Sequence, residues 1–192
     1  MSDPLLLDLP PSIDTGRLLL RPPQAGDGPA HCAAVTESLP ELRQFLASLP
    51  WVAAEPSVEA SEIYCRAALA KFIARTDLPF FLFEKATGQL VGAAGLHRIE
   101  WKTPKVEVGY WVRTSRRGQG FVSEAVLALT DFAFSRLKAE RVELVTDEDN
   151  RDSRRVAERC QFSLEGVLRQ DRRAPDGTLR NTCIYARLPS KP

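Results

Sequence analysis

The segment that most constrains the fold joins a strand pattern to a helix pattern through a loop with two glycines. Residues 106–112 (VEVGYWV) are rich in β-forming side chains, and residues 116–120 (RRGQG) interrupt them. A strand that continues into an amphipathic helix through such a loop predicts a sheet with a helix packed on one face. The apolar stripe of that helix consists of Val122, Ala125, Val126, Leu129 and Ala133.

The loop itself predicts a binding site for an anion. Two glycines allow a tight turn in which successive backbone N–H groups point to one spot. The following helix leaves its first N–H groups unpaired and places the positive end of its dipole there. Arg116 and Arg117 add positive charge, so a pyrophosphate is the expected ligand. The alternative interpretation of this loop is a dinucleotide-binding fold. That fold requires a third glycine, where this chain has Ser123, and a strand–helix–strand unit early in the chain, and neither condition is met.

Strand patterns on both sides of this segment predict a larger sheet. Two pairs of these strands are predicted to form hairpins, with turns at residues 86–89 (ATGQ) and 174–177 (APDG). The mixed order of strands and helices predicts an α+β or α/β fold with helices on both faces of the sheet. Besides residues 106–112, the predicted strands cover residues 17–21, 80–83, 90–99, 141–146, 162–171 and 179–188.

A helical pattern fills residues 26–75. Pro40, Pro50 and Pro56 interrupt it, which predicts several short helices. Ser57 is the expected N-cap of the last of them. The apolar positions that repeat at helical spacing in this last helix are Ile63, Ala67, Ala70 and Ile73.

Composition narrows the class of protein. The 192 residues are 44% apolar and 27% charged, which predicts one globular domain over residues 1–192, with residues 1–15 as a loosely ordered extension. The net charge of +1 argues against a dedicated nucleic-acid binder. No apolar run is long enough for a membrane helix, and no basic residue precedes Arg17, so we expect a cytoplasmic protein without a signal peptide. Four scattered cysteines and two histidines show no metal-ligand spacing, so no metal site is predicted.

Two stretches of the chain resemble the GNAT acetyltransferases. Residues 109–126 (GYWVRTSRRGQGFVSEAV) resemble the acyl-CoA-binding motif of that family. Residues 149–169 (DNRDSRRVAERCQFSLEGVLR) resemble the second half of the site in the branch that acetylates N-terminal alanines of ribosomal proteins. The resemblance implies a mixed, mostly antiparallel, twisted sheet of about seven strands. The family usually has a glycine where Gln161 stands, so this residue is expected to cost about 1 kcal/mol or to change the helix end.

The resemblance implies that acetyl-CoA is the co-substrate. A backbone N–H near Val112 polarises the thioester carbonyl, Asn150 holds the pantetheine arm, and Ser153 protonates the leaving thiolate. As an alternative, Asp152 or Ser153 is only the N-cap of a short helix predicted over residues 153–160. The full set of implied cofactor-binding residues is Val112, Arg113, Arg116, Arg117, Gly118, Gln119, Gly120, Phe121, Asn150, Ser153 and Arg155.

The base that takes the proton from the amine has three candidates. Strand alternation places Glu107 on one face with Gly109 and Trp111, and its carboxylate is the first candidate. His97 is the second, since an unperturbed imidazole has a pKa of ~6.5. The glutamate assigned as base in the alanine-acetylating relatives falls on Arg172 here, which leaves the neighbouring Asp171 as the third.

Trp51, Glu107 and Trp111 are the candidates for binding the acceptor. Trp51 aligns with a tryptophan beside the substrate cleft of relatives, and its alternative role is in the core. We therefore expect an N-acetyltransferase that transfers acetyl to a primary amine, of a protein N-terminus or a small molecule, by direct attack on the thioester. The alternative function is an inactive CoA-binding sensor or scaffold. A homodimer is left open, and neither a membrane nor direct nucleic-acid contact is predicted.

Overall fold

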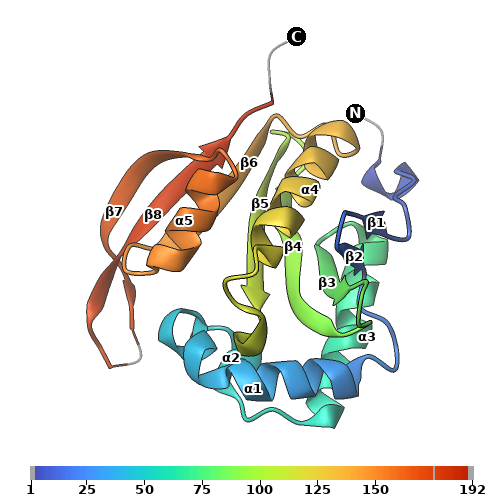
Figure 1. Ribbon diagram of the computed structural model, residues 1–192. Coiled ribbons are helices and arrows are strands. Elements are labelled where there is room, and N and C mark those ends of the chain that lie inside the picture. Colours follow the sequence, from blue (N-terminus) through green and yellow to red (C-terminus); the bar gives the residue numbers. More distant parts are fainter. Residues whose placement is uncertain (1–2, 175, 190–192) are drawn as a thin grey trace.

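The computed structural model describes residues 3–174 and 176–189 (Figure 1). Eight strands of these residues form one sheet in the order β1-β2-β3-β4-β5-β6-β8-β7. Neighbouring strands are antiparallel except for β5 and β6, which run parallel. The predicted mixed, mostly antiparallel sheet is confirmed, and the short β1 brings the strand number to eight. The strands are β1 (Ile13–Asp14), β2 (Leu18–Arg21), β3 (Leu78–Glu84), β4 (Leu90–Glu100), β5 (Lys105–Val112), β6 (Arg141–Asp147), β7 (Ser163–Arg173) and β8 (Leu179–Arg187).

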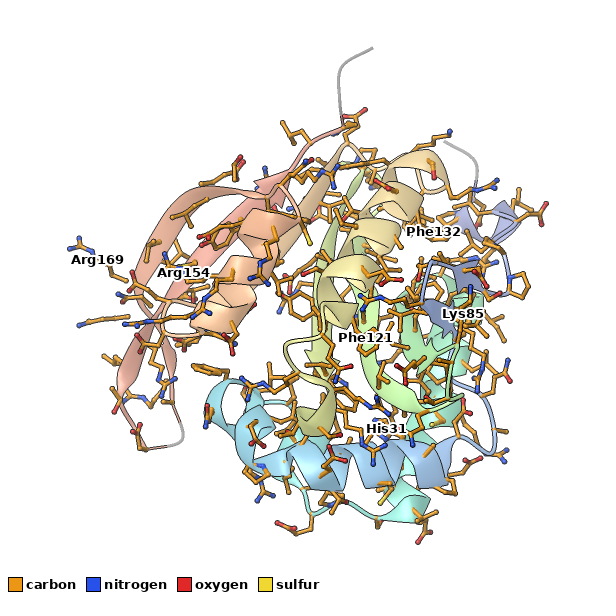
Figure 2. All side chains as sticks on the ribbon, viewed as in Figure 1. His31, Lys85, Phe121, Phe132, Arg154 and Arg169 are labelled. Atoms are coloured by element: carbon orange, nitrogen blue, oxygen red, sulfur yellow. The ribbon has the colours of Figure 1, made fainter. Side chains whose placement is uncertain are left out.

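Helices cover both faces of this sheet. In Figure 1, α4 lies in front of β4 and β5, whereas α1 crosses the lower end of the molecule. Figure 2 shows Phe121 and Phe132 at opposite ends of α4. The helices are α1 (Gly28–Leu46), α2 (Pro50–Ala53), α3 (Val58–Ala74), α4 (Phe121–Ser135) and α5 (Arg151–Arg159), and two 3-10 turns are η1 (Pro4–Leu6) and η2 (Thr114–Arg116). None of the helices in the described ranges is both long and apolar enough to cross a lipid bilayer.

Alternation along β5 divides the core into two clusters. Val106 and Val108 pack with α4 in the larger cluster, whose predicted helix stripe is buried throughout. Trp111 points to the other face and joins the cluster formed with α1. The side-chain alternation predicted for this strand is therefore confirmed. The α1 cluster consists of Ala34, Val35, Leu39, Leu42, Val52, Cys65, Phe81, Leu90, Ala93 and Trp111.

The expected helix break at Pro40 is wrong, because α1 continues through this residue. A proline inside a helix removes one hydrogen bond to the carbonyl four residues earlier, which here belongs to Thr36. Both Thr36 and Pro40 are exposed, so water can bind that carbonyl. Leu39 and Leu42 on the opposite side are buried, and their packing holds the helix together.

The helix predicted after Ser57 is confirmed, but its buried face differs from the apolar stripe. Ser57 caps α3, since its hydroxyl accepts a hydrogen bond from Ala60 N at 3.0 Å. Ile63 and Ile73 are each 62% exposed. The side that faces the protein carries Ser61, Cys65, Ala68 and Phe72, of which only Phe72 is large. The spacing of apolar residues therefore predicts the helix correctly but not which of its faces is buried.

The parallel pair β5 and β6 opens after three residues. Their register runs from Lys105 opposite Arg141 to Glu107 opposite Glu143. Beyond that point β6 continues to pair with β8, and β5 continues to pair with β4. The two strands diverge on the way toward the glycine loop (Figure 1). The sheet thus has an opening between β5 and β6, on the side where β5 leads into the loop that precedes α4.

Gln161 ends α5 in the left-handed conformation, with a φ of 65°. Its N–H donates to Glu158 O at 3.0 Å, and Phe162 N donates to Ala157 O at 2.9 Å. This helix end suits glycine, which has no Cβ to strain.

We expect Gln161→Gly to raise the free energy of unfolding by up to about 1 kcal/mol, because the left-handed conformation no longer strains a side chain. Urea unfolding followed by circular dichroism measures the change. Glu158→Gly, placed in a helical conformation of the same helix, is the matched control and should destabilise by about 1 kcal/mol. A loss of stability in both variants would contradict the prediction.

Candidate active site

The loop before α4 presents a row of unpaired backbone N–H groups. Gly118 and Gly120 adopt φ values of 73° and 81°. The N–H groups of residues 118–123 donate to no acceptor among the described residues, and the next one, of Glu124, bonds to Gly120 O. These groups surround the N-terminus of a 15-residue helix. This arrangement is typical of a phosphate site, as the sequence predicts.

The arginines around the loop are engaged by other side chains. Arg117 pairs with Asp152 of α5 at 2.6 Å, and Arg155 lies 3.7 Å from the same carboxylate. Arg116 contacts Gln89 and lies 3.4 Å from Glu84. These pairs tie the loop to its neighbours, so backbone N–H groups are the main groups left to meet an anion.

Glu37 of α1 fixes the start of this loop. Its carboxylate accepts a hydrogen bond from Ser115 N at 2.9 Å and pairs with Arg113. Partial burial opposes the charge of Glu37, but the Ser115 hydrogen bonds and the Arg113 guanidinium prevail and lower its pKa to about 2. The side chain of Arg113 is therefore turned toward α1. An element of the opposite face thus holds the loop expected to bind the cofactor.

Val112 is oriented toward the opening between β5 and β6. Arg113 N donates to Val91 O of β4 at 2.8 Å. Because successive N–H groups of a strand point in opposite directions, the Val112 N–H points away from β4. The side that it faces is the one from which β6 has diverged.

Asn150, Ser153 and Tyr110 meet at the beginning of α5. Asn150 is the N-cap, since its Oδ1 accepts from Ser153 N at 3.1 Å, so the alternative that Asp152 or Ser153 caps this helix is wrong. The Ser153 hydroxyl lies 2.9 Å from the Tyr110 hydroxyl of β5. Burial raises the pKa of Tyr110, which keeps that hydroxyl protonated at neutral pH. A hydroxyl pair therefore bridges the two sides of the opening.

Glu107 and His97 are neighbours on the face of the sheet opposite α4. They are register partners in β5 and β4. Glu107 pairs with Arg98, and its side chain is 17% exposed. Nδ1 of His97 lies 2.6 Å from Oδ1 of Asp77. Two of the three candidate bases, Glu107 and His97, therefore lie together. The third, Asp171, lies on the outer strand β7, as does Arg172, which is hydrogen-bonded to Thr182.

Trp51 and Trp111 also come together on this face. Their ring centroids are 5.9 Å apart, and His31 of α1 stacks between Tyr64 and Phe81 beside them. Figure 2 shows His31 on the side of α1 that faces the strands. A cavity of about 50 Å³ opens here and is lined by His31, Trp51 and Tyr64. This aromatic wall lies on the same face of the sheet as His97 and Glu107, and aromatic rings are suited to hold a cationic acceptor.

His31 makes the stability of this wall depend on pH. Only 3% of the residue is exposed, and burial lowers its pKa from 6.5 to about 4, although the Asp27 carboxylate opposes the shift. The unfolded chain therefore binds a proton below pH 6.5 that the folded protein refuses until about pH 4. The neutral His31 ring therefore makes its full contribution to the free energy of unfolding above pH 6.5, and this contribution is lost as pH falls toward about 4.

We expect the free energy of unfolding to fall by roughly 2–3 kcal/mol more in the wild type than in His31→Phe when pH drops from 7 to 4.5. Phenylalanine keeps the stacking and removes the titration. Urea unfolding at the two pH values measures both changes, and carboxylates contribute equally to each protein. Equal losses in the two proteins would contradict the prediction.

Comparison with known proteins identifies the family to which the chain belongs. The model of the acetyltransferase (GNAT) domain family matches residues 17–163. The chain belongs to the GNAT acetyltransferase family. As a GNAT enzyme it is an N-acetyltransferase that depends on acetyl-CoA. The fold and function implied by the sequence motifs are thereby confirmed.

Individual relatives extend over much of this GNAT chain. A Bacillus licheniformis protein, "Uncharacterized N-acetyltransferase p20", is 26% identical over 91% of the chain and 94% of the relative. The "Ribosomal-protein-serine acetyltransferase" of Escherichia coli is 33% identical over 57% of the chain and 59% of the relative. A solved structure, "RimL- Ribosomal L7/L12 alpha-N-protein acetyltransferase in complex with Coenzyme A", is 25% identical, with a TM-score of 0.84 over 92% of the chain and 97% of that structure.

Sequence reasoning missed four residues of this GNAT site. Glu37, Asp77 and His31 lie far in sequence from the loop, the histidine and the tryptophans that they contact. Tyr110 lies on the same face of β5 as Val106 and Val108, so its position indicates a core residue and not a partner of Ser153. Nothing in the local sequence signals these contacts.

Proposed function

We propose that the acceptor is the N-terminal amine of a protein or peptide, which attacks the thioester of acetyl-CoA directly. The observation that carries this proposal is the division of the site across the β5–β6 opening. Phosphate-binding N–H groups and the Ser153 hydroxyl lie on the α4 and α5 side. The aromatic wall, His97 and Glu107 lie on the other face. Two substrates approaching from opposite faces can react without a covalent enzyme intermediate.

Each group on the cofactor side has a role in this proposal. The N–H groups of residues 118–123 bind the pyrophosphate, and the Nδ2 group of Asn150 holds the pantetheine, because its Oδ1 is used by the helix cap. The Val112 N–H donates to the thioester oxygen and stabilises the charge that develops there. Ser153 gives a proton to the departing sulfur, with Tyr110 as its hydrogen-bond partner.

Two relatives support a peptide acceptor, because their names specify protein acetylation: a ribosomal-protein-serine acetyltransferase and an alpha-N-protein acetyltransferase. Trp51 is partly buried and lines the small cavity, so it can pack against the first residue of a peptide, whereas Trp111 is buried behind it. The cytoplasmic location predicted from the sequence belongs to the same proposal, since ribosomal proteins are made there.

A library of short peptides with free N-termini, assayed with acetyl-CoA by thiol release, tests this function. We expect acetylation of a subset, with the label found by mass spectrometry on the N-terminal nitrogen. The same peptides with a blocked N-terminus are the matched controls and should not react. Efficient acetylation of small amines together with no reaction on any peptide would overturn the proposed acceptor.

A further inference from the structure

Asp77 and His97 form a hydrogen-bonded pair on the face of the sheet opposite α4, and His97 is the register partner of Glu107, the last residue of β5 that pairs with β6. Asp77 precedes β3, and its Oδ1 lies 2.6 Å from Nδ1 of His97 in β4. A carboxylate at this nitrogen accepts a hydrogen bond from the Nδ1–H group and so leaves the lone pair on Nε2. The His97 side chain is 37% exposed, and Nε2 has no hydrogen-bond partner among the residues that the structure describes.

Two glycines make room for the imidazole. Gly95 and Gly109 are register partners in β4 and β5. A Cβ at Gly95 would lie 2.8 Å from Cε1 and Nε2 of His97, and one at Gly109 would lie 3.0 Å from Cδ2 and 3.3 Å from Nε2. The ring therefore lies against the strands, with Nε2 over the glycine pair. Gly109 is three residues before Val112, whose N–H faces the opening.

We propose that Nε2 of His97 is the base of the transferase and that Asp77 is the residue that positions it. This inference rests on the proposed direct attack. One proton of the acceptor ammonium passes to Nε2 and then to water, which frees the lone pair that forms the N–C bond. The C–S bond breaks, and the sulfur takes up one proton as the nitrogen loses its second. The Asp77 carboxylate stabilises the imidazolium while it carries the proton.

Glu107 is less suited to this role. Arg98 occupies its carboxylate, and this arginine reaches it from a bulge in β4 where its φ is 49°. The ion pair with Arg98 would have to break before this carboxylate could approach the proton of an amine. The charged or titratable groups around the imidazole are Asp77 before β3, Tyr64 of α3, Arg98 of β4, Glu107 of β5, and Arg141 and Glu143 of β6.

The rate test compares His97→Gln with the wild type from pH 6 to pH 10, with any amine that the enzyme acetylates. We expect kcat/KM at pH 7 to fall on the order of 10²–10⁴-fold, and the deficit to shrink as pH approaches the pKa of the amine. The affinity for acetyl-CoA, measured by calorimetry, should stay unchanged and shows that the variant is folded. A pH profile that overlays the wild type would overturn the proposal, as would a deficit of this size in Glu107→Gln alone.

The positioning role has its own readout, because the chain contains two histidines. In ¹⁵N-histidine spectra, we expect His97 to carry its proton on Nδ1 in the wild type and to shift toward the Nε2–H form in Asp77→Asn. This variant should also lose at least about 10-fold in kcat, whereas the exposed Asp131→Asn in α4 is the matched control. An unchanged tautomer in Asp77→Asn would exclude the positioning role. Because any acetylated amine serves, failure of the peptide acceptor is a separate result.

Discussion

Valine at both Gly118 and Gly120 is expected to weaken acetyl-CoA binding by at least about 100-fold, or roughly 3 kcal/mol. Both residues have positive φ values, which a β-branched side chain adopts only with strain of about 1–2 kcal/mol each. Their N–H groups belong to the unpaired row at the start of α4, so a change in loop conformation turns several donors away from the pyrophosphate. A Cβ would also stand between the backbone and its ligand.

Titration calorimetry with acetyl-CoA measures this loss. Gly177→Val is the matched control, because Gly177 also has a positive φ, of 87°, and has open space around its Cα. It should lose about 1–2 kcal/mol of stability, the strain of one such residue, while its affinity for acetyl-CoA stays at the wild-type value. Unchanged affinity in the Gly118 and Gly120 variant would mean that the cofactor binds elsewhere.

Ser153→Ala is expected to lower kcat by about 10–100-fold with little change in the affinity for acetyl-CoA. The reason is the loss of the hydroxyl that we propose protonates the departing sulfur. Tyr110→Phe removes the partner of that hydroxyl and should lower kcat by a smaller factor, since Ser153 keeps its own proton. Single-turnover thiol release separates this step from product dissociation.

The helix cap supplies the control for Ser153. Asn150 and not Ser153 caps α5, so Asn150→Ala should cost about 1 kcal/mol of unfolding free energy while Ser153→Ala costs less. If Ser153→Ala lost stability and kept its kcat, the residue would be structural and the sulfur would take its proton from another donor.

Features encoded within one segment could be predicted from the sequence. The glycine loop, the α4 stripe and the β5 alternation each depend on neighbours in the chain, and all three are found in the structure. The inner face of α3 could not be predicted, because it is set by what α1 and β3 present to it. Pro40 shows the same limit, since burial of Leu39 and Leu42 outweighs a local helix-breaking preference.

The same distinction between local and long-range features applies to the candidate site. Motif residues such as Gly118, Asn150 and Ser153 lie where the sequence places them, because each belongs to a helix start that is defined locally. The pairing of His97 with Asp77 spans 20 residues and depends on the register of β3 against β4. Only the assembled sheet shows that His97 is paired with a carboxylate and Glu107 with an arginine.

The bond between Glu37 and the loop at residues 113–115 has a consequence for engineering and for evolution. Because its pKa is about 2, Glu37 stays ionised throughout the working range of the enzyme and keeps its hold on Ser115 and Arg113. A change in helix α1 at position 37 is therefore expected to change the loop at residues 113–115 as well. We therefore expect a chimera that takes α1 from another acetyltransferase to need a carboxylate at position 37, because without it the proposed acetyl-CoA loop loses its contact with α1.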